Sequence, residues 1–122
     1  MQIDLSDQVA LVTGAGHRVG KAIALELARC GVHILVHYHR SADETVRNTM
    51  HDIKSLGVDA FSVQADISQN EGVDMVFDAI RENFGRLNIL VNSASTFPKG
   101  TLLETSLEDW QQALDVNLTA PF

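Results

Sequence analysis

The sequence predicts an α/β fold with a doubly wound parallel sheet, because short apolar runs alternate with segments of helical periodicity. Four such runs and four such segments follow one another along the 122 residues. The runs at residues 8–12 and 32–38 are mostly apolar without alternation, which is typical of parallel strands buried on both faces. Strands joined through helices imply right-handed crossovers within one sheet.

The predicted elements can be placed by residue number. Strands are expected at 8–12, 32–38, 60–65 and 87–91. Helices are expected at 18–30, 41–56, 68–84 and from 106 onward. The apolar face of the first helix is predicted from its helically spaced residues Val19, Ala22, Ile23, Leu27 and Cys30. We expect Cys30, the single cysteine, to be a buried apolar side chain, with a reactive thiol as the alternative.

Three of these helices carry start signals. The spacing S-x-x-E at Ser41–Glu44 and at Ser68–Glu71 predicts a capping box in each case. Ser106 precedes two acidic residues, which are favourable in the first turn of a helix. Each of these three predicted helices therefore has a defined beginning.

Composition and charge exclude several classes of protein. The net charge of −7 and the lack of Lys/Arg clusters argue against nucleic-acid binding. No apolar run approaches the roughly 20 residues of a membrane span, and the acidic N-terminal segment shows no signal peptide. We therefore expect a cytoplasmic protein that does not contact membranes and acts on a small molecule.

The segment TGAGHRVG, Thr13 to Gly20, lies between the first predicted strand and the first predicted helix. A strand, a glycine-rich turn and a helix in this order form the cradle for a dinucleotide pyrophosphate. Gly14 would let backbone N–H groups approach phosphate oxygens, and Gly20 would let the helix pack close to the sheet. The alternative is a purely structural turn. The context favours a Rossmann-type fold.

The end of the second strand indicates which dinucleotide is bound. NAD-selective sites place an acidic residue here, but the segment His37, Tyr38, His39, Arg40 and Ser41 has no carboxylate. A guanidinium, a hydroxyl and protonated imidazoles suit a 2′-phosphate, so NADP is predicted over NAD. Two alternatives are a metal site at the two histidines, which lacks a third ligand, and a solvated histidine cluster.

The turn also resembles the T-G-x-x-x-G-x-G element of the short-chain dehydrogenase/reductase family, with Arg18 in place of the middle glycine. Arg18, the segment HYHRSADE and Ser95 resemble the pteridine reductase branch of that family. The resemblance covers nearly the whole chain, but only the first half of a family member. It implies that residues 1–122 are the N-terminal NADP-binding half of a single Rossmann-type domain, without the C-terminal catalytic half. The fold would have the strand order 3-2-1-4 and be truncated after the fourth strand and part of the following helix.

The resemblance implies roles for individual residues. Asp66 would bind the adenine amino group, with helix capping as its alternative, and Ile67 would lie against the ring. The segment Asn92 to Ser95 resembles the N-N-A-G element that lines the ribose, with Ser93 and Ser95 departing from it. The cofactor-binding residues so predicted are Gly14, His17, Arg18, Val19, His37, Tyr38, His39, Arg40, Ser41, Asp66, Ile67, Asn92, Ser93, Ala94 and Ser95.

Two further residues are predicted from the last part of the chain. Asn117 matches the asparagine that kinks the fourth helix of the family and holds a water in its proton relay, so it is the one predicted catalytic residue. Phe97 would either stack on a flat heterocycle or lie in the core. No metal ligands are predicted.

The resemblance implies a catalytic motif Tyr-x-x-x-Lys, which does not occur here, since Ala42 follows the only tyrosine, Tyr38, by four residues. This chain alone is therefore expected to be inactive. The full-length protein would be an NADP-dependent oxidoreductase, a homo-oligomer that transfers hydride from NADPH to a pterin-like or other carbonyl or imine substrate. A 3-oxoacyl thioester is the alternative substrate, and a non-catalytic nucleotide-binding fragment is the alternative function.

Overall fold

Strands and helices alternate along the chain in the computed structural model, which describes residues 3–122. Met1 and Gln2, the start of the acidic N-terminal segment, lie outside the described residues. The elements are β1 (Val9–Val12), α1 (Arg18–Arg29), β2 (His33–Tyr38), α2 (Asp43–Lys54), β3 (Ala60–Gln64), α3 (Asn70–Asn83), β4 (Ile89–Val91), α4 (Leu107–Leu114) and the π-helical η1 (Asp115–Thr119). The predicted alternation is confirmed.

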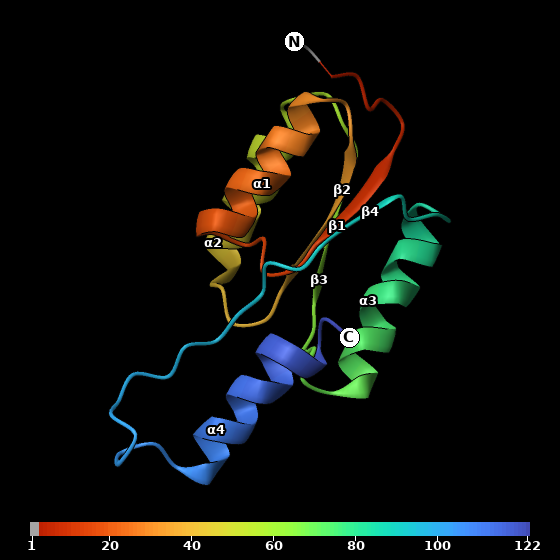
Figure 1. Cartoon of the computed structure of the whole chain (residues 1–122). Helices are drawn as coiled ribbons and strands as arrows, with labels where there is room; N and C mark the ends of the chain where they lie inside the picture. Colours follow the sequence, from red (N-terminus) through yellow and green to blue (C-terminus); the bar gives the residue numbers. More distant parts are fainter. Residues whose placement is uncertain (1–2) are drawn as a thin grey trace.

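The four strands form one parallel sheet in the order β3-β2-β1-β4, as predicted. Helices α1 and α2 cover one face and α3 covers the other, so the sheet is doubly wound (Figure 1). Helix α4 lies beyond the carboxyl ends of the strands (Figure 1). This placement leaves the carboxyl edge of the sheet bordered by loops and by α4.

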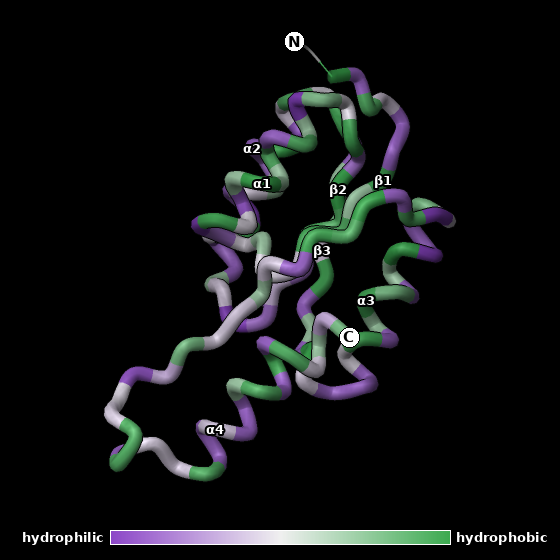
Figure 2. Tube along the Cα trace, in the orientation of Figure 1, coloured by the Kyte–Doolittle hydropathy of each residue, from purple (hydrophilic) through white to green (hydrophobic). Residues whose placement is uncertain are grey.

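The core explains why β1 and β2 are apolar at nearly every position. Ala10 and Ile34 face the layer of α1 and α2, whereas Leu11 and Leu35 face Val76 on α3. Since both faces of these strands are covered, no position on β1 reaches solvent. The hydrophobic interior follows the central strands in Figure 2.

The buried face of α1 differs from the prediction. Its buried residues are Gly20, Ala24 and Ala28, while Val19 is 67% exposed and Cys30 is half-buried. The small residues let α1 approach the sheet closely. Apolar periodicity by itself did not show that this face of the helix would be the one packed against the sheet. Ala22 is also exposed, so the prediction was wrong for this residue as well as for Val19 and Cys30.

Both predicted capping boxes are wrong. Helix α2 has Ala42 as its N-cap and α3 has Gln69, neither with a side-chain cap bond. The Ser68 hydroxyl instead donates to the Asp66 carboxylate at 2.6 Å. Only the last start signal is confirmed: the Ser106 hydroxyl accepts the N–H of Asp109 at 3.0 Å.

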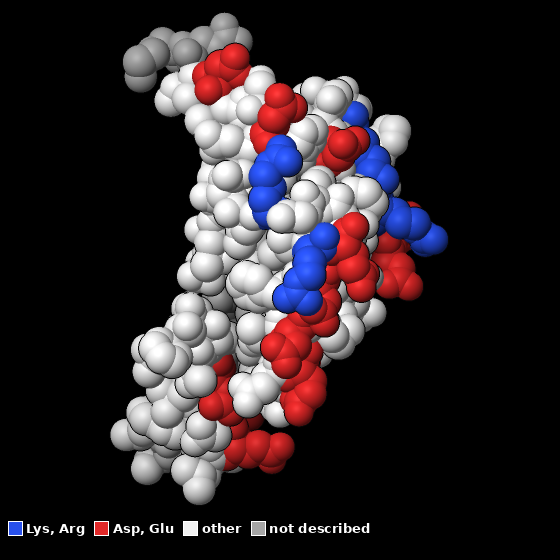
Figure 3. Space-filling view, turned by 90° about the vertical axis from the view of Figure 1, so that its right-hand side faces the viewer, with Lys and Arg blue, Asp and Glu red and all other residues white. Residues whose placement is uncertain are grey.

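Charged side chains are distributed unevenly over the surface. On the face shown in Figure 3, acidic and basic groups share one half, and the other half is almost free of charge. No helix formed by residues 3–122 combines the length and apolar character that a membrane span requires. The same residues bring together no group of three histidine, cysteine or acidic side chains fit to hold a metal ion.

Candidate functional site

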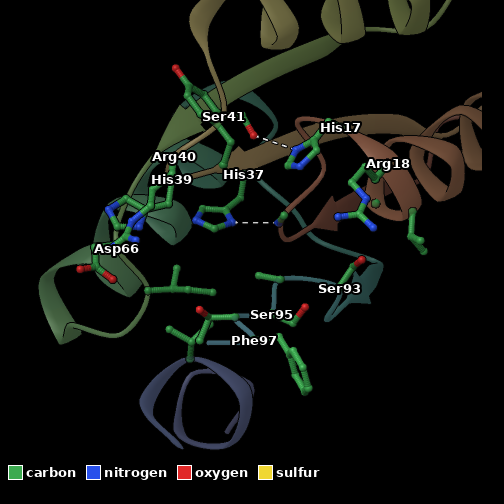
Figure 4. A pocket seen from close by; sticks show the side chains of 18 of the residues that line it. His17, Arg18, His37, His39, Arg40, Ser41, Asp66, Ser93, Ser95 and Phe97 are labelled. Atoms are coloured by element: carbon green, nitrogen blue, oxygen red, sulfur yellow. Dashed lines mark hydrogen bonds between the residues drawn. The ribbon is translucent and has the colours of Figure 1, made fainter. Parts of the chain in front are cut away.

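A cavity of about 730 Å³ lies at the carboxyl edge of the sheet (Figure 4). It is bordered by the turn after β1, the segment after β2, the loops after β3 and β4, and α4. Doubly wound sheets bind ligands at this edge. The predicted cofactor-binding residues that line it are Gly14, His17, Arg18, Val19, His37, Tyr38, His39, Arg40, Ser41, Asp66, Ile67, Ser93, Ala94 and Ser95.

Two predicted site residues do not line this cavity. Asn92 is exposed just after β4, next to the lining residue Ser93. Asn117 lies in η1, and its side-chain amide is bound to the backbone of Thr96. The cavity is also lined by residues that sequence reasoning did not single out for the site, among them Thr45, Gln112 and Val116.

The turn after β1 is shaped by Gly14. Its φ of +63° is in the left-handed region, where a side chain is strained. A Cβ there would lie 2.7 Å from the Cα of Ala94, which belongs to the loop after β4. Glycine is thus required both for the backbone conformation and for the close approach of the two segments that border the cavity.

Two threonines fasten this turn, and sequence reasoning missed both. The Thr13 hydroxyl accepts the N–H groups of Ser93 and Ala94, each at 3.0 Å, and so joins the end of β1 to the loop after β4. The fully buried Thr49 of α2 donates its hydroxyl to the Gly16 carbonyl at 2.7 Å. A signal for Thr49 existed, since it shares a helical stripe with the buried residues Val46 and Ile53.

Arg18 has a left-handed backbone, with φ of +54°. Non-glycine residues adopt this conformation at a cost of about 1–2 kcal/mol. The side chain is exposed, and its guanidinium lies on the cavity side of the turn (Figure 4). The strain therefore accompanies a positive charge at the mouth of the cavity.

The segment after β2 brings basic and hydroxyl groups to the cavity. The Ser41 hydroxyl lies 3.0 Å from Nδ1 of His17, which ties this segment to the turn after β1. Arg40 is exposed, and Figure 4 shows Arg40 and His39 near Asp66. The first carboxylate after β2, Asp43, does not line this cavity.

Asp66 carries a negative charge on the side of the cavity away from Arg18 (Figure 4). Its carboxylate accepts the hydroxyl of Ser68 at 2.6 Å and the N–H of Ser68 at 3.0 Å. The hydroxyl bond above all, helped by the N–H bond and by the charges of His39 and Arg40, holds the pKa of Asp66 below its ordinary value. Asp66 thus holds the turn before α3 but does not cap that helix, whose N-cap is Gln69, so the helix-capping alternative is wrong. It also lines the cavity as an ionised acceptor.

His37 lines the cavity but cannot act as the protonated imidazole that the sequence predicted. Its side chain is 2% exposed, and its ring bridges the N–H of Gly14 and the carbonyl of Ala65. Burial lowers the pKa of His37 below 6.5, so the ring is neutral at physiological pH. Both nitrogens are occupied, which also leaves none for a metal ion.

The loop after β4 is held by Asn117. The N–H of Thr96 donates to its Oδ1 at 2.9 Å, and its Nδ2 donates to the Thr96 carbonyl at 2.8 Å. Asn117 lies in the π-helical segment, so the predicted irregularity of this helix is confirmed. In this structure it positions the loop that carries Ser95 and Phe97. Phe97 is 90% exposed at the cavity, so the core alternative for this ring is wrong.

Comparison with known proteins places this geometry in a family. The short chain dehydrogenase family model matches residues 8–122. Glucose 1-dehydrogenase 2 of Bacillus subtilis is 39% identical over 126 residues, covering 100% of this chain and 47% of that protein. A 3-oxoacyl-[acyl-carrier-protein] reductase of Synechocystis is 40% identical over 121 residues, covering 97% of this chain and 47% of that protein.

A solved structure has the same fold over the same part. L-sorbose reductase from Gluconobacter frateurii, complexed with NADPH and L-sorbose, superimposes with a TM-score of 0.90 at 32% identity. The match covers 99% of this chain and 46% of that one. The chain spans about half the length of the curated relatives that it matches. By its sequence and its fold, it belongs to the short chain dehydrogenase family.

Proposed function

We propose that residues 1–122 form the NADP(H)-binding half of a short-chain reductase. The observation that carries this proposal is the set of residues that line the carboxyl-edge cavity. There the glycine turn after β1 meets a segment with His39, Arg40 and Ser41 and no carboxylate. Charge-assisted bonds from such groups favour a 2′-phosphate over a free 2′-hydroxyl. The NADPH complex of the related L-sorbose reductase supports the choice of cofactor.

Each group of predicted cofactor-binding residues has a proposed partner on the cofactor. The turn with Gly14, His17, Arg18 and Val19 would bind the pyrophosphate, and Tyr38 to Ser41 would bind the 2′-phosphate. Asp66 and Ile67 would contact the adenine, and Asn92 to Ser95 would border the ribose. Gly14 lines the cavity without a side chain of its own, which fits the close approach of a phosphate to the backbone of the turn. NADPH, when bound, would supply the hydride, and these residues would bind and orient the cofactor.

A binding titration tests the proposal. NADPH and NADH are titrated separately into the protein and followed by the change in nicotinamide fluorescence. We expect NADPH to bind at least about tenfold more tightly, which corresponds to about 1.4 kcal/mol. Equal affinities, or tighter binding of NADH, would show that the segment after β2 does not select a 2′-phosphate.

For the substrate of the full-length protein, we propose a pterin-like ring that is reduced at a C=N or C=O bond. Support comes from the resemblance of Arg18, residues 37–41 and Ser95 to pteridine reductases, and from the exposed Phe97, whose face could stack on a flat heterocycle. The second candidate is a 3-oxoacyl thioester, favoured by the 40% identity to the Synechocystis reductase. NADPH oxidation by the full-length protein with a dihydropterin and with a 3-oxoacyl thioester would decide between them. No turnover of either would favour a non-catalytic nucleotide-binding protein.

Replacing Arg18 with glycine should have opposite effects on stability and on binding. Glycine adopts positive φ freely, so the variant should gain about 1 kcal/mol in the free energy of unfolding. Loss of the guanidinium should weaken NADPH binding about tenfold, as for one charged contact. Denaturant unfolding and the titration above measure the two effects. A variant that is less stable than the original protein and binds NADPH with equal affinity would contradict the proposed role of Arg18 at the pyrophosphate.

A further inference from the structure

His37 joins the carboxyl ends of three neighbouring strands. Its ring lies between Gly14, in the turn after β1, and Ala65, just after β3. Its own carbonyl also accepts the N–H of Ala15 at 2.9 Å. The phosphate-binding turn is therefore fastened to β2 by two bonds from consecutive residues, and the side chain extends this connection to β3.

The partners of the ring determine its tautomer. The N–H of Gly14, 3.1 Å from Nδ1, can only donate, so Nδ1 must be an acceptor. The Ala65 carbonyl, 2.9 Å from Nε2, can only accept, so Nε2 must carry the hydrogen. The described geometry thus requires a neutral ring protonated on Nε2. With 2% exposure, the ring is nearly shielded from water, so water does not readily replace either partner.

We propose that His37 is a positioning residue that sets the phosphate-binding turn through the Gly14 N–H, so that its protonation opens the turn and weakens dinucleotide binding. A proton on Nδ1 would place two donors against each other, and the bond from Gly14 would be lost. Gly14 would then be free to leave the conformation that packs it against Ala94. The binding part of this inference rests on the proposed function, whereas the proton-dependent change in the turn does not.

The surroundings of His37 determine the pH range. Burial above all lowers the pKa of His37 below its ordinary value, and the nearby His39 lowers it further, whereas the Ala65 carbonyl and Asp66 raise it. From the turn after β1, only backbone groups bond to it. Because the folded pKa is depressed, the unfolded chain binds more protons as the pH falls below 6.5. Stability therefore declines as the pH falls below that value, whereas the turn changes only below the lowered pKa of His37 in the folded protein.

Two substitutions divide the functions of the ring between them. The side-chain oxygen in His37→Asn can reach the place of Nδ1, so it keeps an acceptor for Gly14 that does not titrate. The longer side chain of His37→Gln can place its amide nitrogen near Nε2, so it keeps the donor to Ala65 and loses the acceptor. If the bond to Gly14 sets the turn, the two variants must differ in their affinity for NADP⁺. If the ring were merely structural, both variants would lose affinity equally.

Binding of NADP⁺ to the protein is measured by calorimetry from about pH 8 to about pH 5, a range that spans ordinary histidine ionisation. The 2′-phosphate of the cofactor itself ionises at about pH 6. This contribution is common to all variants, so His37→Asn serves as the control for it. Below the pKa of His37, the original protein should lose affinity about tenfold more per pH unit than His37→Asn. His37→Gln should bind weakly even at the upper end of the range.

Nuclear magnetic resonance of the ring nitrogens, without cofactor, tests the inference separately from the proposed function. We expect the Nε2–H tautomer at neutral pH, and a Gly14 amide signal that shifts with the protonation of His37. An Nδ1–H tautomer, or a Gly14 amide indifferent to that protonation, would overturn the inference. So would matching pH profiles of binding for the original protein and His37→Asn. A protein that shows the expected ring signals and binds no NADP⁺ at any pH would contradict the proposed function alone.

Discussion

Gly72→Ala should destabilise this protein by at least about 3 kcal/mol, although alanine is ordinarily the better helix former. Gly72 lies in the first turn of α3, where a Cβ would come 1.9 Å from the carbonyl oxygen of Asp66 and 2.5 Å from its carbon. Both are backbone atoms and cannot rotate away. Helix α3 would have to move away from the end of β3, and Val76 and Ile80 would lose part of their packing against the sheet.

Thermal and denaturant unfolding measure this effect, and we expect the midpoint temperature to fall by about 10 °C or more. Asp74→Ala is the matched control, because it places the same side chain at an exposed position of the same helix. That variant should stay within about 0.5 kcal/mol of the original protein. An unchanged midpoint for Gly72→Ala would mean that α3 does not approach Asp66 as closely as described.

Arg40→Asp should weaken NADPH binding by about 100-fold and leave NADH binding nearly unchanged. Arg40 is exposed at the cavity in the segment proposed to hold the 2′-phosphate. A charge-assisted contact contributes about 1.5–3 kcal/mol, and the introduced carboxylate would also repel the phosphate. A loss of about 2.8 kcal/mol corresponds to the stated factor.

The control for this variant is Arg47→Asp. Arg47 is an exposed arginine of α2 that does not line the carboxyl-edge cavity, so the change in net charge is the same without the local contact. Titration of both variants with both dinucleotides gives four affinities. Equal losses for NADPH and NADH, or equal losses in the two variants, would contradict a 2′-phosphate role for Arg40.

The order of elements could be predicted because the chain signals it locally. The apolar runs of β1 and β2 reflect burial on both faces, and Ser106 binds the N–H of Asp109 three residues on. The capping predictions at Ser41 and Ser68 were wrong because another partner took each hydroxyl. Ser41 lies against His17, 24 residues away, and Ser68 donates to Asp66. A short pattern does not show such competing partners.

The candidate site was predictable to the extent that strand ends converge on one edge in a parallel sheet. This rule places the residues after β1, β2, β3 and β4 together without knowledge of any contact. It does not reveal what each side chain does there. The bond between His37 and Gly14 spans 23 residues, and that between Thr49 and Gly16 spans 33. Such pairings arise from the packing of separate elements, so they were visible only in the structure.

The paired bonds between Thr96 and Asn117 have a consequence for how this region can change. They join positions 21 residues apart at a single point, so the stretch from Phe97 to Ser106 and α4 lie on a closed loop. Closing a loop of twice the length costs only about 0.6 kcal/mol more. Insertions in the exposed stretch would therefore alter its reach at little thermodynamic expense, while Ser95 keeps its place at the cavity. A single side-chain amide separates a part of the molecule that tolerates changes in length from a part that does not.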